Sequence, residues 1–460
     1  MTTMTAAPPR ISRPPARTLR EHVSRTITLA LPVMVARSGL VIMISVGIIM
    51  SGHAGPNEQA YLAAAFAPHM SMLVIGIGLM LGITVLSAQA DGAGRPEDCG
   101  RYWRLGLIMA TVLGIAYSVL MLFGQPLLLM LGQSDDIASH GARVLLMFSF
   151  GMPAMLCFVA TSSFLESIGR PAPGMMVSLG AIVINLALCW IFVFGKLGAP
   201  AMGAAGSALA LSITRWCMVI AIILIARGIS GAQHYGIHAG LAGHYHKIRK
   251  LLGIGLPLAV ATGLESISFS TTTIMAGWLG TSSLAAFQDA LNLNALIFML
   301  AIGLATATSV RVANAVGRKD QDGIRTAGWV GTGLVIAITG ATGIAIALAP
   351  EWIASIYTSN PDVRIILVPA LLLVAWVSVF DGLQCVLIGA TRGTADAIVP
   401  TSIQGFAFWV IMVPLVYWIG IREGHGVQGL FWSIGIALIV SSVLLAARFH
   451  VVSRRVIVPL

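Results

Sequence analysis

The stretch LLGIGLPLAVATGLESISFSTTTIMAGWL, residues 251–279, carries a single charged residue, Glu265. A bilayer core is crossed by about 20 consecutive apolar residues, so a run of this length is typical of a transmembrane helix. An ionised carboxylate near the centre of a membrane is costly, and a glutamate placed there needs a compensating partner or a function. The stretch therefore predicts a membrane-spanning helix with a buried acid.

Apolar runs of similar length fill most of the chain. Of 460 residues, 57% are hydrophobic and 10% are charged, whereas an ordinary soluble domain has about 25% charged residues. Runs long enough to cross a bilayer are expected at 27–50, 60–88, 104–131, 141–167, 174–195, 202–227, 250–276, 283–315, 326–349, 363–389, 397–420 and 427–448. The sequence predicts an all-α polytopic membrane protein with twelve transmembrane helices.

Basic residues are distributed unequally between the two sides of the membrane. With both termini placed inside, the inner loops and tails hold most of the 27 lysines and arginines, and only Arg143, Lys196, Arg364 and Arg422 fall outside. Cytoplasmic loops carry such an excess under the positive-inside rule. Topology explains the net charge of +10, so this charge indicates no nucleic-acid partner.

The two halves of the chain repeat each other at a shift of 225 residues. Aligned pairs include Pro32 and Pro257, Gly78 and Gly303, and Gly92 and Gly317. Six helices return a chain to the side where it began, so the halves run parallel, related by an axis along the membrane normal. We expect two pseudo-symmetric six-helix lobes. The expected divisions are a disordered cytoplasmic tail (1–26), the first lobe (27–227), an interlobe loop (228–249), the second lobe (250–448) and a cytoplasmic tail (449–460).

The interlobe loop is rich in glycine and histidine. His234 and His238 are spaced by one helical turn, and His244 and His246 follow, so a metal site is conceivable. The glycines between them oppose a stable helix, and no cysteine or carboxylate accompanies them. We interpret this segment as a connector whose role the sequence leaves open.

Two acids lie deep within the second half. Counted at about 1.5 Å per residue, Glu265 and Asp381 fall near the membrane midplane, so one cavity can contain both. Ser268 and Thr272 share the helical face of Glu265, and Gln384 follows Asp381 by about one turn. Such a pair can bind a proton, hold Na⁺ through carboxylate oxygens or neutralise a cationic substrate. The alternative is a structural ion pair, or a protonated carboxyl bonded to a neighbouring helix.

Other polar residues in the spans are weaker candidates. Asp289 lies near the outer end of its span, where it either lines a vestibule with Asn292 and Asn294 or is simply solvated. Arg37 either pairs with an acid elsewhere, which is the preferred interpretation, or repels cations. Arg170 and Arg392, which the repeat relates, are interpreted as topology and packing residues.

Patterns of soluble catalysis are missing from the sequence. It contains no GxxxxGK[ST], HExxH or GxSxG pattern, so ATP hydrolysis, zinc proteolysis and serine hydrolysis are not indicated. We predict that the chain is not an enzyme.

Four longer motifs resemble the multidrug and toxic compound extrusion (MATE) transporters. They are GLMLGITVLSAQADGAG (78–94), FLESIGRPAPGM (164–175), GLPLAVATGLESISF (255–269) and FDGLQCVLIGATRGTAD (380–396), and the likeness covers nearly the whole chain in order. The resemblance implies two six-helix lobes around a cavity. It also implies secondary active efflux, in which an inward cation gradient drives the export of organic, typically cationic and amphipathic compounds.

The resemblance is to the NorM-like branch, and it implies roles for particular residues. Glu265 and Asp381 resemble the acids of the seventh and tenth helices, Gln288 a polar position of the cation site, and Phe298 an aromatic position that is often tyrosine. Gly47 stands where many members carry an acid in the first helix, so coupling is expected to rest on the second lobe. The candidate coupling-ion residues are Glu265, Asp381 and Gln288, with Na⁺ possible at the two acids. The candidate cavity residues are Phe298, Gln384, Asp289, Asn292, Ser268 and Thr272.

The sequence thus predicts an antiporter of the bacterial cytoplasmic membrane. It would export organic cations by alternating access in exchange for Na⁺ or H⁺, without a cofactor, as a monomer in the lipid bilayer. The alternatives are a flippase for a lipid-linked precursor or a saccharide exporter, which would need several arginines facing the cavity, and a regulated channel. The coupling ion and the substrate range remain open.

Overall fold

Long helices make up nearly all of the computed structural model, which describes residues 19–237, 246–358 and 360–455. Within these residues, twelve helices are long and apolar enough to cross a membrane. The first six are α1 (Leu19–Ala54), α2 (Pro56–Gly92), α3 (Pro96–Leu122), α5 (Asp135–Ser167), α6 (Ala172–Phe194) and α7 (Gly203–Gly228). The second six are α8 (His246–Trp278), α9 (Thr281–Gly317), α10 (Gln321–Leu348), α12 (Pro361–Gly393), the span Ile398–Arg422 and α15 (Gly426–Val452).

Shorter elements complete the fold. The helices α4 (Gly124–Met130) and α11 (Pro350–Tyr357) each follow the end of a span. The span Ile398–Arg422 is divided into α13 (Ile398–Gly405), α14 (Val413–Leu415) and two π-helical segments, Phe406–Met412 and Val416–Arg422. The predicted all-α fold with twelve transmembrane helices is confirmed.

Several predicted boundaries were wrong. Residues 19–26, assigned to a disordered tail, form the first turns of α1, because His22 and Thr26 are buried against Arg311 of the other lobe. The third span, expected at 104–131, begins at Pro96 and ends at Leu122. Proline fits the first turn of a helix, and the acids Glu97 and Asp98 that follow favour the positive end of the helix dipole.

The ends of the interlobe loop and the start of the last tail also differ from the prediction. Gly228 closes α7, residues 246–249 belong to α8, and α15 continues to Val452. His238 and His244 lie outside the described residues. No group of three metal-binding side chains occurs within the described ranges, so the conceivable metal site gains no support there.

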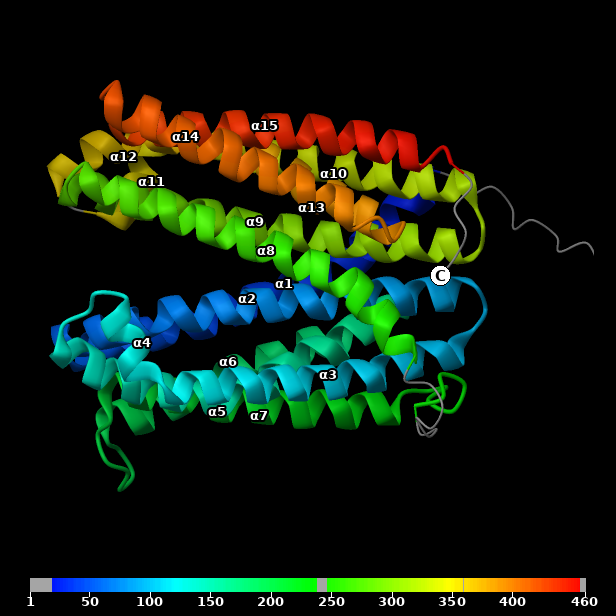
Figure 1. The fold of residues 1–460 in the computed structure, drawn as a ribbon, viewed down its shortest axis with the longest axis horizontal. Helices are drawn as coiled ribbons and strands as arrows, with labels where there is room; N and C mark the ends of the chain where they lie inside the picture. Colours follow the sequence, from blue (N-terminus) through cyan, green and yellow to red (C-terminus); the bar gives the residue numbers. More distant parts are fainter. Residues whose placement is uncertain (1–18, 238–245, 359, 456–460) are drawn as a thin grey trace, which may run out of the picture.

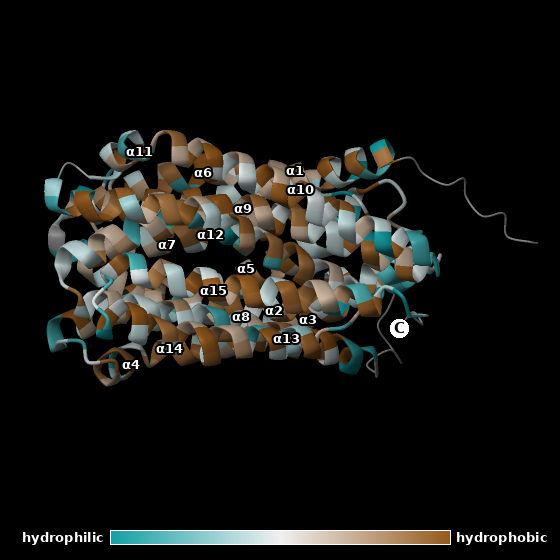
Figure 2. Ribbon diagram, turned by 90° about the horizontal axis from the view of Figure 1, so that it is seen from above, coloured by the Kyte–Doolittle hydropathy of each residue, from teal (hydrophilic) through white to brown (hydrophobic). Residues whose placement is uncertain are grey.

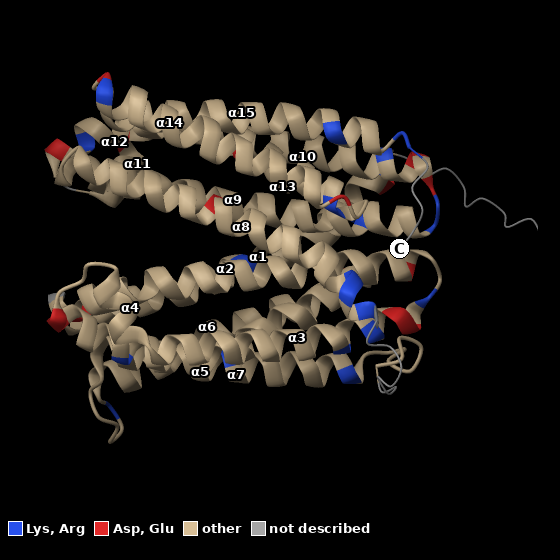
Figure 3. Cartoon of the chain, viewed as in Figure 1, with Lys and Arg blue, Asp and Glu red and all other residues tan. Residues whose placement is uncertain are grey.

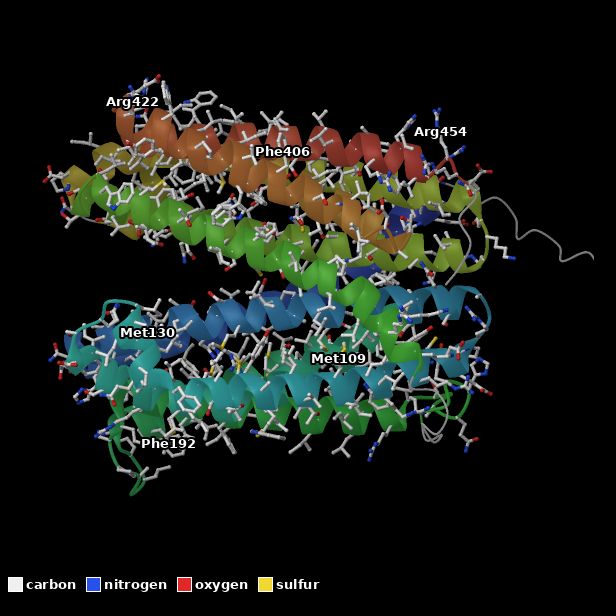
Figure 4. The ribbon with its side chains drawn as sticks, in the orientation of Figure 1. Met109, Met130, Phe192, Phe406, Arg422 and Arg454 are labelled. Carbon is white, nitrogen blue, oxygen red and sulfur yellow. The ribbon has the colours of Figure 1, made fainter. Side chains whose placement is uncertain are left out.

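The surface of the bundle suits a lipid environment. Apolar residues cover the outside of the helices, while hydrophilic residues gather at the two ends (Figure 2). Side chains such as Val183, Leu224 and Ile365 are more than 60% exposed. Charged residues also gather at the ends, with few along the helices (Figure 3). Arg454 marks the end at which the chain terminates, and Arg422 marks the opposite end (Figure 4).

The spans form two lobes, α1–α7 and α8–α15, whose ribbons approach each other at the Arg454 end and diverge toward the Arg422 end (Figure 1). We call these the terminal end and the distal end. The helix α8 crosses to the first lobe at the terminal end, where Lys247 pairs with Asp98 of α3. Asp98 also accepts from Arg101 at 2.8 Å. This cluster anchors the start of the second lobe to the first.

Contacts between the lobes follow the sequence repeat. A Cβ atom on Gly92 would lie 2.2 Å from the carbonyl oxygen of Asn314, and one on Gly317 would lie 2.2 Å from that of Gln89. Both contacts require glycine, and the 225-residue shift exchanges one for the other. Gln89 also donates to the Gly393 carbonyl at 3.1 Å. The lobes therefore meet along a pseudo-twofold axis, as the repeat predicted, and this contact closes the terminal end.

Candidate functional site

A central cavity of about 580 Å³ lies between the lobes. Helices α1, α2, α5 and α7 line it from the first lobe, and α8, α9, α12 and α13 from the second. Half of its lining residues are leucine, isoleucine, valine or methionine, and five of them are methionines: Met43, Met70, Met155, Met218 and Met299. Methionine is flexible and polarizable, so this lining adapts to ligands of different shape.

Both predicted acids line the cavity on the second lobe. Asp381 of α12 is 5% exposed, and its Oδ2 accepts from Asn294 Nδ2 of α9 at 2.9 Å. Glu265 of α8 accepts at Oε2 from Gln404 Nε2 of α13 at 3.4 Å. Three helices besides α8 thus hold the pair, and each acid is supported by a neutral amide instead of a cation. We call Glu265, Asp381, Asn294 and Gln404 the acidic wall.

The acidic wall and the neighbouring Gln384 contain oxygen atoms suited to a hard cation. Asn294 Oδ1 and Gln384 Oε1 are buried and have no hydrogen-bond partner within the described part of the chain. Gln384 stands about one helical turn after Asp381, on the same face of α12. Sodium binds carboxylate and amide oxygens, so two carboxylates and two unpartnered amide oxygens fit it; the carboxylates alone fit a proton.

The other predicted site residues divide into two groups. Phe298 and Gln384 line the cavity. Ser268 and Thr272 are buried, but they donate to backbone carbonyls of their own helix at 2.8 Å and 3.0 Å and do not line it. A helical hydroxyl commonly satisfies itself in this way, which removes it from the cavity surface.

The predicted residues near the start of α9 lie beyond the cavity. Gln288 falls on the same helical stripe as the lining residues Leu291 and Phe298, but it is exposed about one turn further toward the distal end. Asp289 is half-buried outside the lining, and Asn292 is exposed and accepts from Tyr357. The structure therefore brings none of these three residues to Glu265 and Asp381.

Sequence reasoning placed Asn294 in an outer vestibule with Asp289 and Asn292, and it missed Gln404. The repeat contained a signal for Asn294, because it stands 225 residues after His69, another polar residue in an apolar run. The helical stripe through Phe298 also includes it. Gln404 had no comparable signal, since only the packing of α13 against α8 brings it to Glu265.

Three arginines line the opposite and terminal sides of the cavity. Arg37 of α1 forms an ion pair with Glu166 of α5 at 3.7 Å, which confirms that it pairs with an acid elsewhere. Arg215 of α7 donates from Nη2 to His69 Nε2 at 3.2 Å. His69 is fully buried and stacks on Phe148, with ring centroids 4.2 Å apart.

The third arginine, Arg392, was interpreted from the sequence as a packing residue, like Arg170. It is buried and donates to Ser309 Oγ at 3.4 Å, and it also lines the cavity. Arg170 instead donates to Ser230 in an exposed position. The two repeat-related arginines differ because α12 borders the space between the lobes, whereas the end of α5 faces the connector that follows α7.

One protein-family model matches the chain twice, once in each half. The MatE family model matches residues 32–191 and again 257–418, so its two copies begin 225 residues apart. A probable multidrug resistance protein NorM of Caulobacter vibrioides is 31% identical over 430 residues, which are 93% of this chain and 91% of the relative. The multidrug resistance protein NorM of Burkholderia vietnamiensis is 31% identical over 458 residues, 98% of this chain and 96% of the relative.

A solved structure shares the fold. The eukaryotic MATE transporter AtDTX14 matches with a TM-score of 0.86 at 20% sequence identity, over 95% of this chain and 98% of that one. At this identity the likeness supports the architecture, and the relationship itself rests on the family model and the bacterial relatives.

Proposed function

Because the chain belongs to the MatE family of membrane transporters, we propose that it exports organic, amphipathic compounds and is driven by an inward gradient of Na⁺ or H⁺. Its relatives are transporters and not enzymes, in agreement with the absence of catalytic motifs. The NorM relatives carry multidrug resistance in their names, which supports a broad substrate range.

The observation that carries the proposal is the acidic wall in an adaptable cavity. Two carboxylates held by neutral amides have no cation partner of their own within ion-pairing distance among the described residues. A buried anion without a counterion favours the binding of a cation or a proton. A positively charged substrate competes for the same charge.

Exchange follows from this competition. Substrate and coupling ion lower each other's affinity by the same factor, because linkage is reciprocal. Ion binding at Glu265 and Asp381 from the outside would release the substrate there, and loss of the ion to the inside would prepare the cavity for another. The ion gradient thereby drives export.

The orientation supports export from a bacterial cytoplasm. Basic residues of the loops gather at the terminal end, which the positive-inside rule places in the cytoplasm, with both termini. The lobe contact of Gly92 and Gly317 closes that end, and with this orientation we assign the structure to an outward-facing state. We place the chain in the cytoplasmic membrane as a monomer, since one chain contains both lobes and a whole cavity.

Proteoliposomes test the proposal directly. Ethidium export would be measured under a sodium gradient alone and under a pH gradient alone, for the wild type, Glu265→Gln and the exposed control Glu351→Gln. One gradient should drive export against the ethidium gradient in the wild type and in the control, and Glu265→Gln should lose about tenfold or more of the rate. If neither gradient drives export in the wild type, coupled antiport is wrong.

A second candidate function rests on the three cavity arginines. A flippase for a lipid-linked precursor needs a cationic cavity for its phosphates, and Arg215 and Arg392 lack a carboxylate partner among the described residues. Against it stand the acids of the acidic wall and the pairing of Arg37 with Glu166. Accumulation of a lipid-linked precursor on gene deletion, with drug sensitivity unchanged, would favour this candidate.

A further inference from the structure

Coupling to a cation does not explain the arginines of the cavity, and Arg215 is the one without an oxygen acceptor among the described residues. It lies on α7, is 3% exposed and lines the cavity from the first lobe. Its Nη1 is buried and has no hydrogen-bond partner, and no carboxylate of the described chain lies within 4.0 Å of its guanidinium. A guanidinium stays protonated in proteins, so a positive charge faces the cavity without an anion.

His69 does not supply the missing charge. An arginine only donates hydrogen bonds, so His69 Nε2 accepts from Nη2 and the imidazole is neutral, with its proton on Nδ1. Stacking on Phe148 fixes the ring in this orientation. The contact therefore positions Arg215 and leaves its charge uncompensated.

The other two cavity arginines show the contrast. Arg37 has the carboxylate of Glu166 and Arg392 has the hydroxyl of Ser309, so each contacts an oxygen acceptor. Arg215 contacts only a nitrogen lone pair within the described residues. An isolated buried charge is costly, and an anionic ligand group that enters the cavity would relieve that cost.

We propose that Arg215 binds a carboxylate group of the transported compound, while the acidic wall binds its amine. The preferred substrates are then amphipathic zwitterions that carry both groups, with the apolar body against the methionine-rich lining. This inference rests on the proposed function and adds to it the chemistry of the substrate. Charge-assisted hydrogen bonds from arginine to carboxylate are strong and directional, so one such contact is enough to select for the group.

Two rhodamine dyes form a matched pair for the test. Rhodamine 110 has a free carboxylate, and rhodamine 123 is its methyl ester, so they share the amines and the ring system. Binding to the purified full-length protein would be measured by fluorescence polarisation for the wild type, Arg215→Met, Arg215→Lys and Arg227→Met. Arg227 lies exposed at the end of the same helix and serves as the control.

The expected result separates the two dyes. Arg215→Met should weaken rhodamine 110 by about tenfold or more and rhodamine 123 by less than about twofold, because only the first loses a charge-assisted bond. Arg215→Lys should keep most of the rhodamine 110 affinity, and Arg227→Met should change neither dye. Retained rhodamine 123 binding also shows that the variant is folded.

Several outcomes would overturn the inference. They are an equal loss for both dyes, no loss for either, or a wild type that does not bind rhodamine 110. The wild-type affinity for each dye would also be measured in chloride and in gluconate. If replacing chloride by gluconate changes the affinity for both dyes, Arg215 binds an inorganic anion instead. The proposed function fails separately, if Glu265→Gln leaves rhodamine 123 export unchanged.

Discussion

The two lobes have the same helical plan but opposite charge around the cavity. In the second lobe, Asn294 donates to a carboxylate, Asp381. In the first lobe, the repeat-related position is His69, which accepts from a guanidinium, Arg215. Leu40 and Val159 occupy the positions that correspond to Glu265 and Asp381. Duplication accounts for the scaffold, and the chemistry of the site comes from residues at which the halves have diverged.

The largest effect is expected from removing the charge of the second lobe. Asp381→Asn keeps the shape of the side chain and its contact with Asn294 but removes the anion that attracts the coupling ion. Export driven by an ion gradient should fall by about tenfold or more, as is typical for functional acids within membranes. The assay is ethidium export from proteoliposomes with Glu351→Gln as control, and wild-type rates in Asp381→Asn would refute a role for this acid.

The pseudo-symmetric contact should respond equally on its two sides. In both Gly92→Ala and Gly317→Ala the new methyl group would overlap a carbonyl oxygen of the other lobe. Overpacking of about 1–3 kcal/mol would raise the population opened at the terminal end by about fivefold to a hundredfold.

Thiol labelling measures this opening. Ala313 is fully buried between the lobes, so Ala313→Cys places a reporter thiol there, in a background where the exposed Cys217 is replaced by serine. In inside-out vesicles this thiol should be labelled faster in each glycine variant than in the protein with both glycines. Gly333→Ala is the matched control, because a Cβ there meets nothing within 4 Å. Unequal rates in the two glycine variants would contradict a symmetric contact.

A smaller effect is expected from changing Asn294. The concentration of coupling ion needed for half-maximal export should rise if the ion is sodium and fall if it is a proton. Asn294→Leu removes both the amide that donates to Asp381 and an amide oxygen that fits sodium. The sodium concentration for half-maximal export should rise by about threefold to tenfold, since a ligand is lost. If protons are the coupling ion, the carboxylate loses a bond that favoured its charged form, so half-saturation should need fewer protons. An unchanged dependence on both ions would remove Asn294 from the site.

The smallest effect on transport is expected from the ion pair of the first lobe. Arg37→Met leaves Glu166 as a buried charge and should lower the melting temperature by several degrees. The double variant Arg37→Met with Glu166→Gln should recover most of that loss, and its ethidium export should stay within about twofold of wild type, because the pair is neutral as a whole. A double variant less stable than Arg37→Met alone would show that the two residues act independently.

Much of the fold and part of the site could be predicted from the sequence. Long apolar runs determine where helices cross a membrane, and a lone acid such as Glu265 is conspicuous within them. The start of α1 could not be predicted, because its first turns are fixed by contacts with Arg311, far along the chain. Nor could the sequence show that Asn294 contacts Asp381, since only the rotation of α9 against α12 brings this amide to the carboxylate.

The exchange of Gly92 with Gly317 at the lobe contact has a consequence for the history of the chain. A contact in which each half offers the other the same surface is the interface of a twofold homodimer, where every residue occurs twice. In such a dimer a glutamate at the position of Glu265 would face a second glutamate, and an arginine at the position of Arg215 a second arginine. A single polypeptide that contains both halves is free of this constraint, so one side can be acidic while the other is basic.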